Sequence, residues 1–500
     1  MSVLHKRFCA SHPDVKISQS TFALLKPFWV KKPCIQDSDT CLCKLHENTR
    51  LLHEKLRHIK LIPNCSVADV VRHTVCNREL TNRSCMTNSC THCKNRNLPF
   101  STSHSLADHT ISWHQWQTVR VDVDDRKQVR KTAKQTVRGS VNSLKASYVS
   151  AVSLLKPHMY TISNQYNVIT AKRHNLSDKE VMIHIDFSEN WTKKAATAVQ
   201  SAHFGSSLEQ ITLHTGVAYF SHDRHMSFCS LSDSNDHRPT AIWSHLIPVL
   251  ISVREKYDDV NILHVVSDGP TTQYRNRYNF YLCTVIPQLF QFRFTWWNFT
   301  EAGHGKGPAD GVGAAIKRLA DRCVLAGEDI ADASSLKCAL ERLTDVKLFL
   351  VKDVVTLSDH MNIPAFPGTM KIHQLLASST GRVSYRPWSC YCCATRMCTC
   401  IKTQTVNVGH IDKSGVTLRL PSFEMNTPVC SQTEETSVTD ENISAPNFTE
   451  FCTGTAMNTA DVQYIILHDS LDIINCLPTH LNTELFSETS CTYCFCFFGI

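Results

Sequence analysis

Three aspartates follow patterns that would bring acidic groups to one place. Asp186 ends an apolar run that begins at Val181, and Asp268 follows a second apolar run, residues 262–266. Asp310 lies in a glycine-rich phrase, GKGPADGVG, that opens a helical pattern. Two strands and a helix that each deliver one carboxylate can hold divalent cations for phosphoryl transfer, because Mg²⁺ prefers hard oxygen ligands. The sequence therefore predicts an acidic metal site.

Simpler interpretations of these acids and their neighbours stay open. Asp186 and Asp268 can also be ordinary acids at strand ends, which are common. Only the combination of these two with Asp310 favours a metal site. Glu189 can support Asp186 from three residues away. His304 can contact a phosphate or position a water, although a core or surface histidine is the simpler interpretation. The GKG phrase is not a P-loop, because the G-x4-G-K-[ST] spacing is absent.

Cysteines supply a second kind of candidate chemistry. The chain holds 24 of them, and its polar first ten residues lead us to expect no signal peptide. Clustered cysteines then bind metal more often than they form disulfides. Short spacings such as Cys90-x2-Cys93 let one turn supply two ligands of a tetrahedral zinc ion. The candidate ligands are Cys41, Cys43, His46, Cys76, Cys85, Cys90 and Cys93 in the first group and Cys390, Cys392, Cys398 and Cys400 in the second.

These groups predict two structural zinc sites. Which side chains share each ion stays open, and buried or reactive free thiols are the alternative. Either site can serve DNA binding or protein contact.

Basic residues recur between residues 122 and 156, where apolar residues also fall at helical spacing. We therefore expect an amphipathic helix that ends before Pro157. Its basic face would contact phosphates beside the acidic site, and an ordinary solvated face is the alternative. The basic residues are Lys127, Arg130, Lys131, Lys134 and Arg138.

The elements that must position the aspartates are expected in a fixed order. Apolar periodicity predicts three strands, then helix, strand, helix, strand and helix. The strands are expected at residues 181–186, 210–220, 225–230, 261–267 and 292–298, and the helices at 239–257, 274–289 and 308–320. Gly311 and Gly313 would let the last helix approach the sheet closely. The predicted fold class is α/β with a mixed sheet.

This order resembles the ribonuclease-H-like fold of DDE transposases and integrases. The phrases HIDFSENW, HFGSSLEQITLHTGV, VVSDGPTTQYRNRYNF and GHGKGPADGVGAAIKR are similar to those of large transposase-derived proteins in animal genomes, as is the cysteine-rich flank TCLCKLHEN…CMTNSCTHC. The resemblance implies two divalent ions, Mg²⁺ or Mn²⁺, held by Asp186, Asp268 and Asp310, with DNA as the partner. Most such enzymes place Glu at the third position, so Asp310 departs from the commoner pattern.

Charge and length divide the rest of the chain. Residues 401–500 contain three Lys and Arg against twelve Asp and Glu, whereas the whole chain has a formal charge of +7. We expect a zinc-binding region (1–118), the basic helix (119–160), a ribonuclease-H-like core (161–350), a second zinc-binding segment (351–402) and an acidic, largely disordered tail (403–500). No apolar run approaches the ~18 residues of a membrane helix. A nuclear or cytoplasmic protein, as a monomer or a homo-oligomer, is expected.

Three functions compete at this point. The first is metal-dependent DNA strand transfer or cleavage. The second is an inactive descendant that binds DNA or protein through its zinc modules. The third is a ribonuclease-H-like exonuclease, which usually has Glu two residues after the first Asp. Here Glu189 stands three residues after Asp186, which lowers this third expectation.

Overall fold

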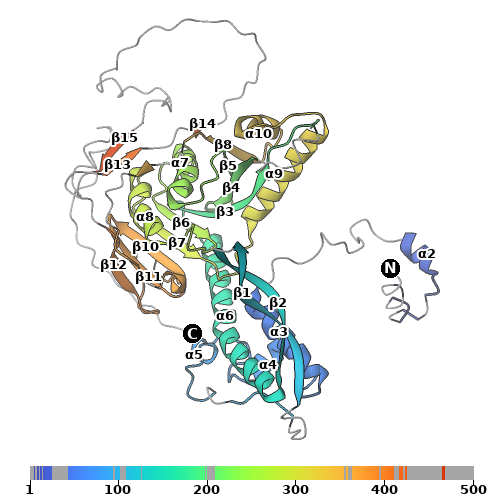
Figure 1. Cartoon of the computed structure of the whole chain (residues 1–500). Helices are drawn as coiled ribbons and strands as arrows, with labels where there is room; N and C mark the ends of the chain where they lie inside the picture. Colours follow the sequence, from blue (N-terminus) through green and yellow to red (C-terminus); the bar gives the residue numbers. More distant parts are fainter. Residues whose placement is uncertain are drawn as a thin grey trace, which may run out of the picture. The chain divides into compact units, whose positions relative to one another are not determined.

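The computed structural model divides into two compact units, Met1–Val70 with Leu98–Leu155, and Val71–Asn97 with Lys156–Ile500. Figure 1 shows the elements coloured along the chain. The residues that the structure describes are 5, 8–10, 12–13, 15–24, 43–93, 96–101, 109–124, 127–197, 199, 209–353, 356–357, 363–366, 368–393, 396–409, 416–419, 423–424 and 464–467. Of the predicted zinc ligands, Cys41 lies outside them, as does most of the predicted tail.

The first unit combines helices with a long two-stranded ribbon. Its elements include α2 (Gln19–Leu24), α3 (Lys44–His58), β1 (Thr110–Asp124), β2 (Lys127–Ser140) and the start of α6 (Val141–His174). Helix α3 buries Leu52 and Leu56, and Nδ1 of its His53 lies 2.7 Å from the hydroxyl of Tyr148 in α6. This buried bond ties α3 to α6 within the unit. Helix α4 (Val67–His73) spans the boundary between the two units.

The basic helix predicted to begin near residue 122 is wrong, because residues 127–140 form strand β2. This strand pairs antiparallel with β1 from Thr110↔Ser140 to Asp122↔Gln128. Residues four apart share a face in a helix and in a strand alike, so the spacing of Arg130, Lys134 and Arg138 cannot separate the two. The β-branched residues between them favour the strand.

The helix that follows also differs from the prediction. Helix α6 begins at Val141 and continues through Pro157 to His174, although a proline was expected to end it. Pro157 removes one backbone donor from the helix. Further along, Gln165 is buried and accepts a bond from the Ser389 backbone at 2.8 Å. Tertiary packing therefore outweighs the local cost of the proline.

The second unit is built on a mixed sheet of ten strands. Their order is β12-β11-β10-β7-β6-β3-β4-β5-β8-β14. In the middle, β3 and β4 are antiparallel, as are β4 and β5, whereas β3, β6 and β7 are mutually parallel. These strands are β3 (Glu180–Thr192), β4 (Gln210–Tyr219), β5 (His225–Ser232), β6 (Ile262–Ser267), β7 (Phe294–Phe299), β8 (Val346–Val351), β10 (Gln374–Ser379), β11 (Arg382–Arg386), β12 (Gln404–Asn407) and β14 (Phe423–Glu424).

Helices cover both faces of this sheet. One core cluster joins α7 (Pro239–Lys256) and α8 (Arg277–Leu289) to one face, and another joins α9 (Pro308–Leu325) and α10 (Ala333–Leu340) to the other. The strand and helix order predicted for residues 181–320 is confirmed, as is the mixed α/β class. In the described part of the chain, no helix is long and apolar enough to cross a membrane.

The segment after β8 does not stand apart from the sheet. Strand β10 pairs with β7, and β11 pairs with β10, so part of the segment expected as a separate zinc-binding region belongs to the sheet. Strand β12, which lies in the predicted tail, pairs with β11 and extends the same sheet. Further short elements of this unit are α5 (Arg83–Met86), a 3₁₀ turn (Thr369–Lys371), and a small sheet of β9 (Thr356–Leu357), β13 (Val416–Arg419) and β15 (Tyr464–Leu467).

Helix α9 approaches β3 closely at one of its two glycines. A Cβ on Gly313 would lie 2.4 Å from Oγ and 2.9 Å from Cβ of Ser188, whereas a Cβ on Gly311 would meet no described atom within 4 Å. The predicted close approach is therefore confirmed for Gly313 and not for Gly311. This contact fixes the helix that carries Asp310 against the strand that carries Asp186.

The two glycines should respond in opposite ways to the same substitution. Gly313→Ala should destabilise the protein by about 1–3 kcal/mol through overpacking. Gly311→Ala should stabilise it by about 0.5–1 kcal/mol, because alanine favours an exposed helical position. Urea unfolding of both variants tests this, and equal effects would contradict the close packing of α9.

Candidate functional site

The sheet and α9 bring the three predicted aspartates together. Asp186 lies on β3 opposite Thr215, and Asp268 directly follows the last residue of the adjacent strand β6. Asp310 stands in the first turn of α9. The hydroxyl of Thr215 donates to the Ala309 carbonyl at 3.0 Å and to the Asp186 carbonyl at 3.3 Å, so the start of α9 is bonded to the strand beside Asp186.

The three carboxyl groups are half-buried, and their charges oppose one another. Burial and the charges of Asp268 and Asp310 raise the pKa of Asp186 to about 7. Burial and Asp310 raise the pKa of Asp268 to about 6, against the opposing charge of Arg275. Keeping these groups ionised near neutral pH is therefore unfavourable unless a cation joins them.

The oxygen atoms themselves fit a hard cation. Oδ1 of Asp268 is buried, and no described residue donates a hydrogen bond to it. Carboxylate oxygens are the ligands that Mg²⁺ and Mn²⁺ prefer, and few are needed because these ions keep several waters. The residues present therefore suit Mg²⁺ or Mn²⁺.

Asp310 also has a structural role of its own. Its Oδ2 accepts a bond from the Gly307 backbone at 2.8 Å in a capping arrangement at the start of α9. Among the described residues, the three aspartates are not a set whose oxygens all lie within 4.8 Å of one another. A single ion bound by all three carboxylates would thus need the side chains to move. Two ions that each bind two of the carboxylates would not need all three to meet at one point.

Two residues around the acids were missed by the sequence analysis. His184 precedes Asp186 by two residues on β3, and burial lowers the pKa of this histidine to about 4 although Asp310 opposes the shift. Arg275 is buried and donates to the carbonyls of Met370 and Thr300 at 2.8 and 2.9 Å. The sequence could have indicated His184, because residues two apart on a strand lie on the same face and His184 is two residues before Asp186. Arg275 had none.

The loop before α9 packs directly on the acids. A Cβ on Gly305 would lie 2.6 Å from the Cβ of Asp268, so only glycine lets the loop approach this closely. Glu301 in the same loop is bonded to His158 at 2.9 Å and to His373 at 2.6 Å, and these bonds lower its pKa to about 2 despite burial. The ring of His304 lies 5.2 Å from that of His158.

Glu189 does not support Asp186. Its side chain is 93% exposed and lies 3.9 Å from Nζ of Lys317. The pairing of β3 with β4 is irregular between Ser188 and Trp191, where Glu189 falls. The supporting role suggested for Glu189 is therefore wrong.

Four cysteines of the first predicted group form one cluster in the second unit. The Sγ atoms of Cys76, Cys85, Cys90 and Cys93 all lie within 4.8 Å of one another. Sγ of Cys76 is 3.2 Å from that of Cys85 and 3.7 Å from that of Cys90. Tetrahedral zinc with bonds of ~2.3 Å places its sulfurs about 3.8 Å apart, so this cluster can hold a zinc ion. Cys43 and His46 belong to the other unit.

The second predicted group forms a similar cluster. The Sγ atoms of Cys390, Cys392, Cys398 and Cys400 meet the same 4.8 Å limit, and those of Cys390 and Cys392 are 3.4 Å apart. This cluster too can hold zinc, and it includes all four predicted ligands. It follows β11 directly, so the sheet fixes its position.

Each cluster has a buried cation beside it. Lys156 is 6% exposed, and the charges of Cys93 and Cys85 partly offset the lowering of its pKa by burial. Arg386 is 1% exposed and donates from Nη1 to Sγ of Cys398 at 3.2 Å. A zinc ion with four thiolates is a dianion, so a buried cation lowers the cost of burying it.

The predicted basic residues divide between the two faces of the ribbon. Arg130, Lys134 and Arg138 are exposed and share one face of β2, because even spacings along a strand place side chains on the same face. Lys131 is exposed on the other face. The side chain of Lys127 lies outside the described residues. The face of Arg130 also carries Arg120, which the sequence analysis did not include.

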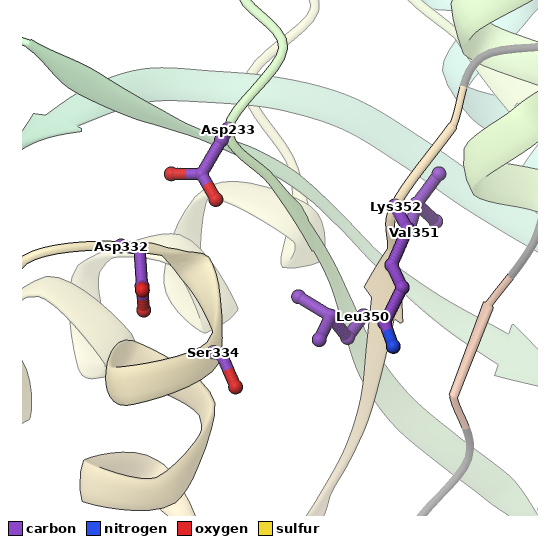
Figure 2. A pocket seen from close by; sticks show the side chains of 6 residues that line it. All are labelled: Asp233, Asp332, Ser334, Leu350, Val351 and Lys352. Atoms are coloured by element: carbon purple, nitrogen blue, oxygen red, sulfur yellow. The ribbon is translucent and has the colours of Figure 1, made fainter. Parts of the chain in front are cut away.

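A surface cavity of about 340 Å³ lies elsewhere in the second unit. Figure 2 shows Asp233, Asp332 and Ser334 on one side of it, and Leu350 and Val351 at the end of β8, followed by Lys352, opposite. Asp233 accepts a bond from the Ala333 backbone at 3.2 Å, and Asp332 caps α10. The carboxylates here have structural partners, and none of the predicted site residues lines the cavity.

Comparison with known proteins gives one match. Residues 165–389, fewer than half of the chain, match the family described as Domain of unknown function (DUF8701). The matched segment contains the three aspartates and neither cysteine cluster. No curated protein and no solved structure matches the chain. The matched family therefore covers the three aspartates together with the strands that carry them, and it assigns no activity.

The repulsion within the acidic site makes a prediction for stability against pH. The pKa of Asp186 is raised in the folded state, so the stabilising contribution of its proton is complete below about pH 4 and is lost as the pH rises through about 7. Asp186→Asn has no carboxyl group to ionise, so the variant does not lose this stability as the pH rises. Without added divalent cations, its stability relative to the parent should be greater at pH 8 than at pH 5 by about 2–3 kcal/mol.

Urea unfolding at the two pH values measures this difference. Glu189→Gln is the matched control, because it removes an exposed acid from the same strand and should show no such pH dependence. A gain for Asp186→Asn that is equal at both pH values would contradict the raised pKa.

The cysteine clusters make a separate prediction. Metal analysis of the purified chain should find about two or more zinc ions per chain. Arg386→Gln should weaken zinc retention at the second cluster by about 10–100-fold, because an adjacent charge is lost. Arg382→Gln, an exposed change on the same strand, should not. A folded, zinc-free parent protein would contradict both sites.

Proposed function

We propose that the chain is a transposase-like enzyme that cleaves or joins DNA strands with two divalent metal ions held by Asp186, Asp268 and Asp310. The observation that carries this proposal is that Asp186 and Asp268 lie on or directly after adjacent parallel strands, with the start of α9 bonded beside them. The pKa values of these two half-buried carboxyl groups are raised to about 7 and about 6. An arrangement that is costly in the absence of a cation supports a cation site.

The strand arrangement supports the same proposal. The chain order of three strands, helix, strand, helix, strand and helix, which resembles that of a ribonuclease-H-like core, is present. These strands form the sheet order β5-β4-β3-β6-β7, with β3, β4 and β5 antiparallel and β6 and β7 parallel to β3. Asp186 and Asp268 lie on or directly after adjacent parallel strands of this order. The fold alone does not specify chemistry, so the acids carry the functional argument.

Each part of the site has a role in this proposal. Mg²⁺ or Mn²⁺ bound there supplies Lewis acidity to a phosphate and lowers the pKa of a bound water. Asp186 and Asp268 supply carboxylate ligands from rigid strands, and Asp310 supplies one from the first turn of α9. Arg275 lowers the pKa of Asp268 and so favours its ionised form. The loop at Gly305 covers Asp268.

A second candidate is an inactive descendant of such an enzyme that binds DNA or protein through its zinc modules. The bond from the Gly307 backbone to Asp310 favours it, because this carboxylate already has a use at the start of α9. The two cysteine clusters support it as well, since neither depends on the acids. The two candidates differ in chemistry, because only the first cleaves or joins DNA strands.

Substitution of Asp268 separates the two candidates. Asp268→Asn replaces one anionic ligand with a neutral one and should lower Mg²⁺-dependent nicking of supercoiled DNA by at least about 100-fold, since the ion stabilises the transition state by several kcal/mol. DNA affinity should be unchanged or slightly higher, because one negative charge near the phosphates is lost. Gel analysis of nicking with Mg²⁺ or Mn²⁺, together with a binding titration, measures both.

Nicking that persists in Asp268→Asn would refute the assigned site. DNA binding without any nicking by the parent protein would favour the inactive descendant instead.

A further inference from the structure

One face of the β1–β2 ribbon in the first unit is exposed along most of its described length, with Trp116 half-buried near its middle. In the antiparallel register, residues with even numbers on both strands share this face, because direct partners such as Ser112↔Arg138 and Arg120↔Arg130 point the same way. The opposite face is partly covered and includes Trp113, which is 5% exposed. The exposed face consists of Ser112, His114, Trp116, Thr118, Arg120, Arg130, Thr132, Lys134, Thr136 and Arg138.

This face is cationic and rich in hydrogen-bonding side chains. It carries Arg120, Arg130, Lys134 and Arg138, and the side chains that the structure describes on the ribbon include no carboxylate. At one edge, Nζ of Lys44 in α3 donates to the Thr118 hydroxyl at 2.9 Å and adds a further cation.

Two carboxylates of α3 are paired with one arginine near this face. Glu47 interacts with Lys134, and Arg50 donates to both Glu47 oxygens at 2.7 Å and to Glu54 at 2.6 Å. These three α3 side chains carry one net negative charge, which is smaller than the positive charge of the four cations on the ribbon face.

Two of these charges destabilise the ribbon. Arg120 and Arg130 are direct cross-strand partners on the exposed face, and like charges in this position repel. A bound polyanion would relieve this repulsion.

We propose that this exposed face binds duplex DNA by entering its major groove. The proposal rests on the proposed function only in taking DNA as the partner, and it assigns the surface that holds the duplex. The major groove is about 12 Å wide and accepts a two-stranded ribbon, whereas side chains cannot read the deep, narrow groove of duplex RNA.

The dimensions and chemistry of the ribbon fit this groove. At ~3.4 Å per residue, residues 110–121 extend about 37 Å, close to one turn of B-DNA at ~34 Å. Arginine can bond a guanine edge with two donors, and threonine can bond a base edge or pack on a thymine methyl group. The face thus combines phosphate attraction with groups suited to base edges.

Two lysines on the same strand provide a matched test. Lys134→Gln removes a charge from the proposed face, and Lys131→Gln removes a charge that is also exposed but lies on the opposite face. Binding of the zinc-loaded full chain to a 30-base-pair duplex is followed by fluorescence anisotropy at several salt concentrations, without added Mg²⁺ or Mn²⁺. Lys134→Gln should reduce the salt slope by about 0.9, and the triple change of Arg130, Lys134 and Arg138 to Gln by about 2–3.

Two probes test the groove. Replacing guanine with 7-deazaguanine removes the N7 acceptor from the major groove and should weaken binding, whereas an RNA duplex of the same sequence should bind at least about tenfold more weakly.

The proposal is overturned if Lys131→Gln and Lys134→Gln weaken binding equally, if the triple variant binds like the parent, or if the RNA duplex binds as well as DNA. Full binding to 7-deazaguanine DNA would also overturn entry into the major groove. These outcomes are independent of nicking, so a failure of the proposed catalytic function leaves this result intact.

Discussion

Repulsion among three half-buried carboxyl groups is the constraint on which the account of the second unit depends. Asp186 and Asp268 are held at adjacent strand positions by the pairing of β3 with β6, so they cannot separate without breaking the sheet. Asp310 is fixed by the first turn of α9, which Gly313 allows to lie against β3. The fold therefore accepts an electrostatic cost that a divalent cation would relieve.

The cysteine clusters meet the same problem in another way. Four thiolates around a zinc ion leave excess negative charge, and each cluster has a buried cation, Lys156 or Arg386, beside it. Arg386 also donates from Nε to Gln374 at 2.7 Å, which links the second cluster to β10. Charge compensation thus positions the clusters as well as stabilising them. At the acidic site, Arg275 opposes the raised pKa of Asp268, yet that pKa is still raised to about 6.

The sequence predicted the central elements because their patterns are local. Apolar runs before Asp186 and Asp268 and the periodicity after Pro308 define β3, β6 and α9. The ribbon was mistaken for a helix because a spacing of four residues fits both. Arg275 and Arg386 were missed because each acts through contacts distant in sequence. The addition of β10, β11 and β12 to the sheet depends on pairing that no local pattern reveals.

The central claim is that the aspartates bind divalent cations. Crystals of the protein grown with Mn²⁺, examined by anomalous scattering at the manganese edge, test it most directly. The account predicts manganese peaks bonded to carboxylate oxygens of Asp186, Asp268 and Asp310. Crystals with ordered aspartates and no manganese between them, at Mn²⁺ concentrations that saturate ordinary Mg²⁺ enzymes, would contradict it.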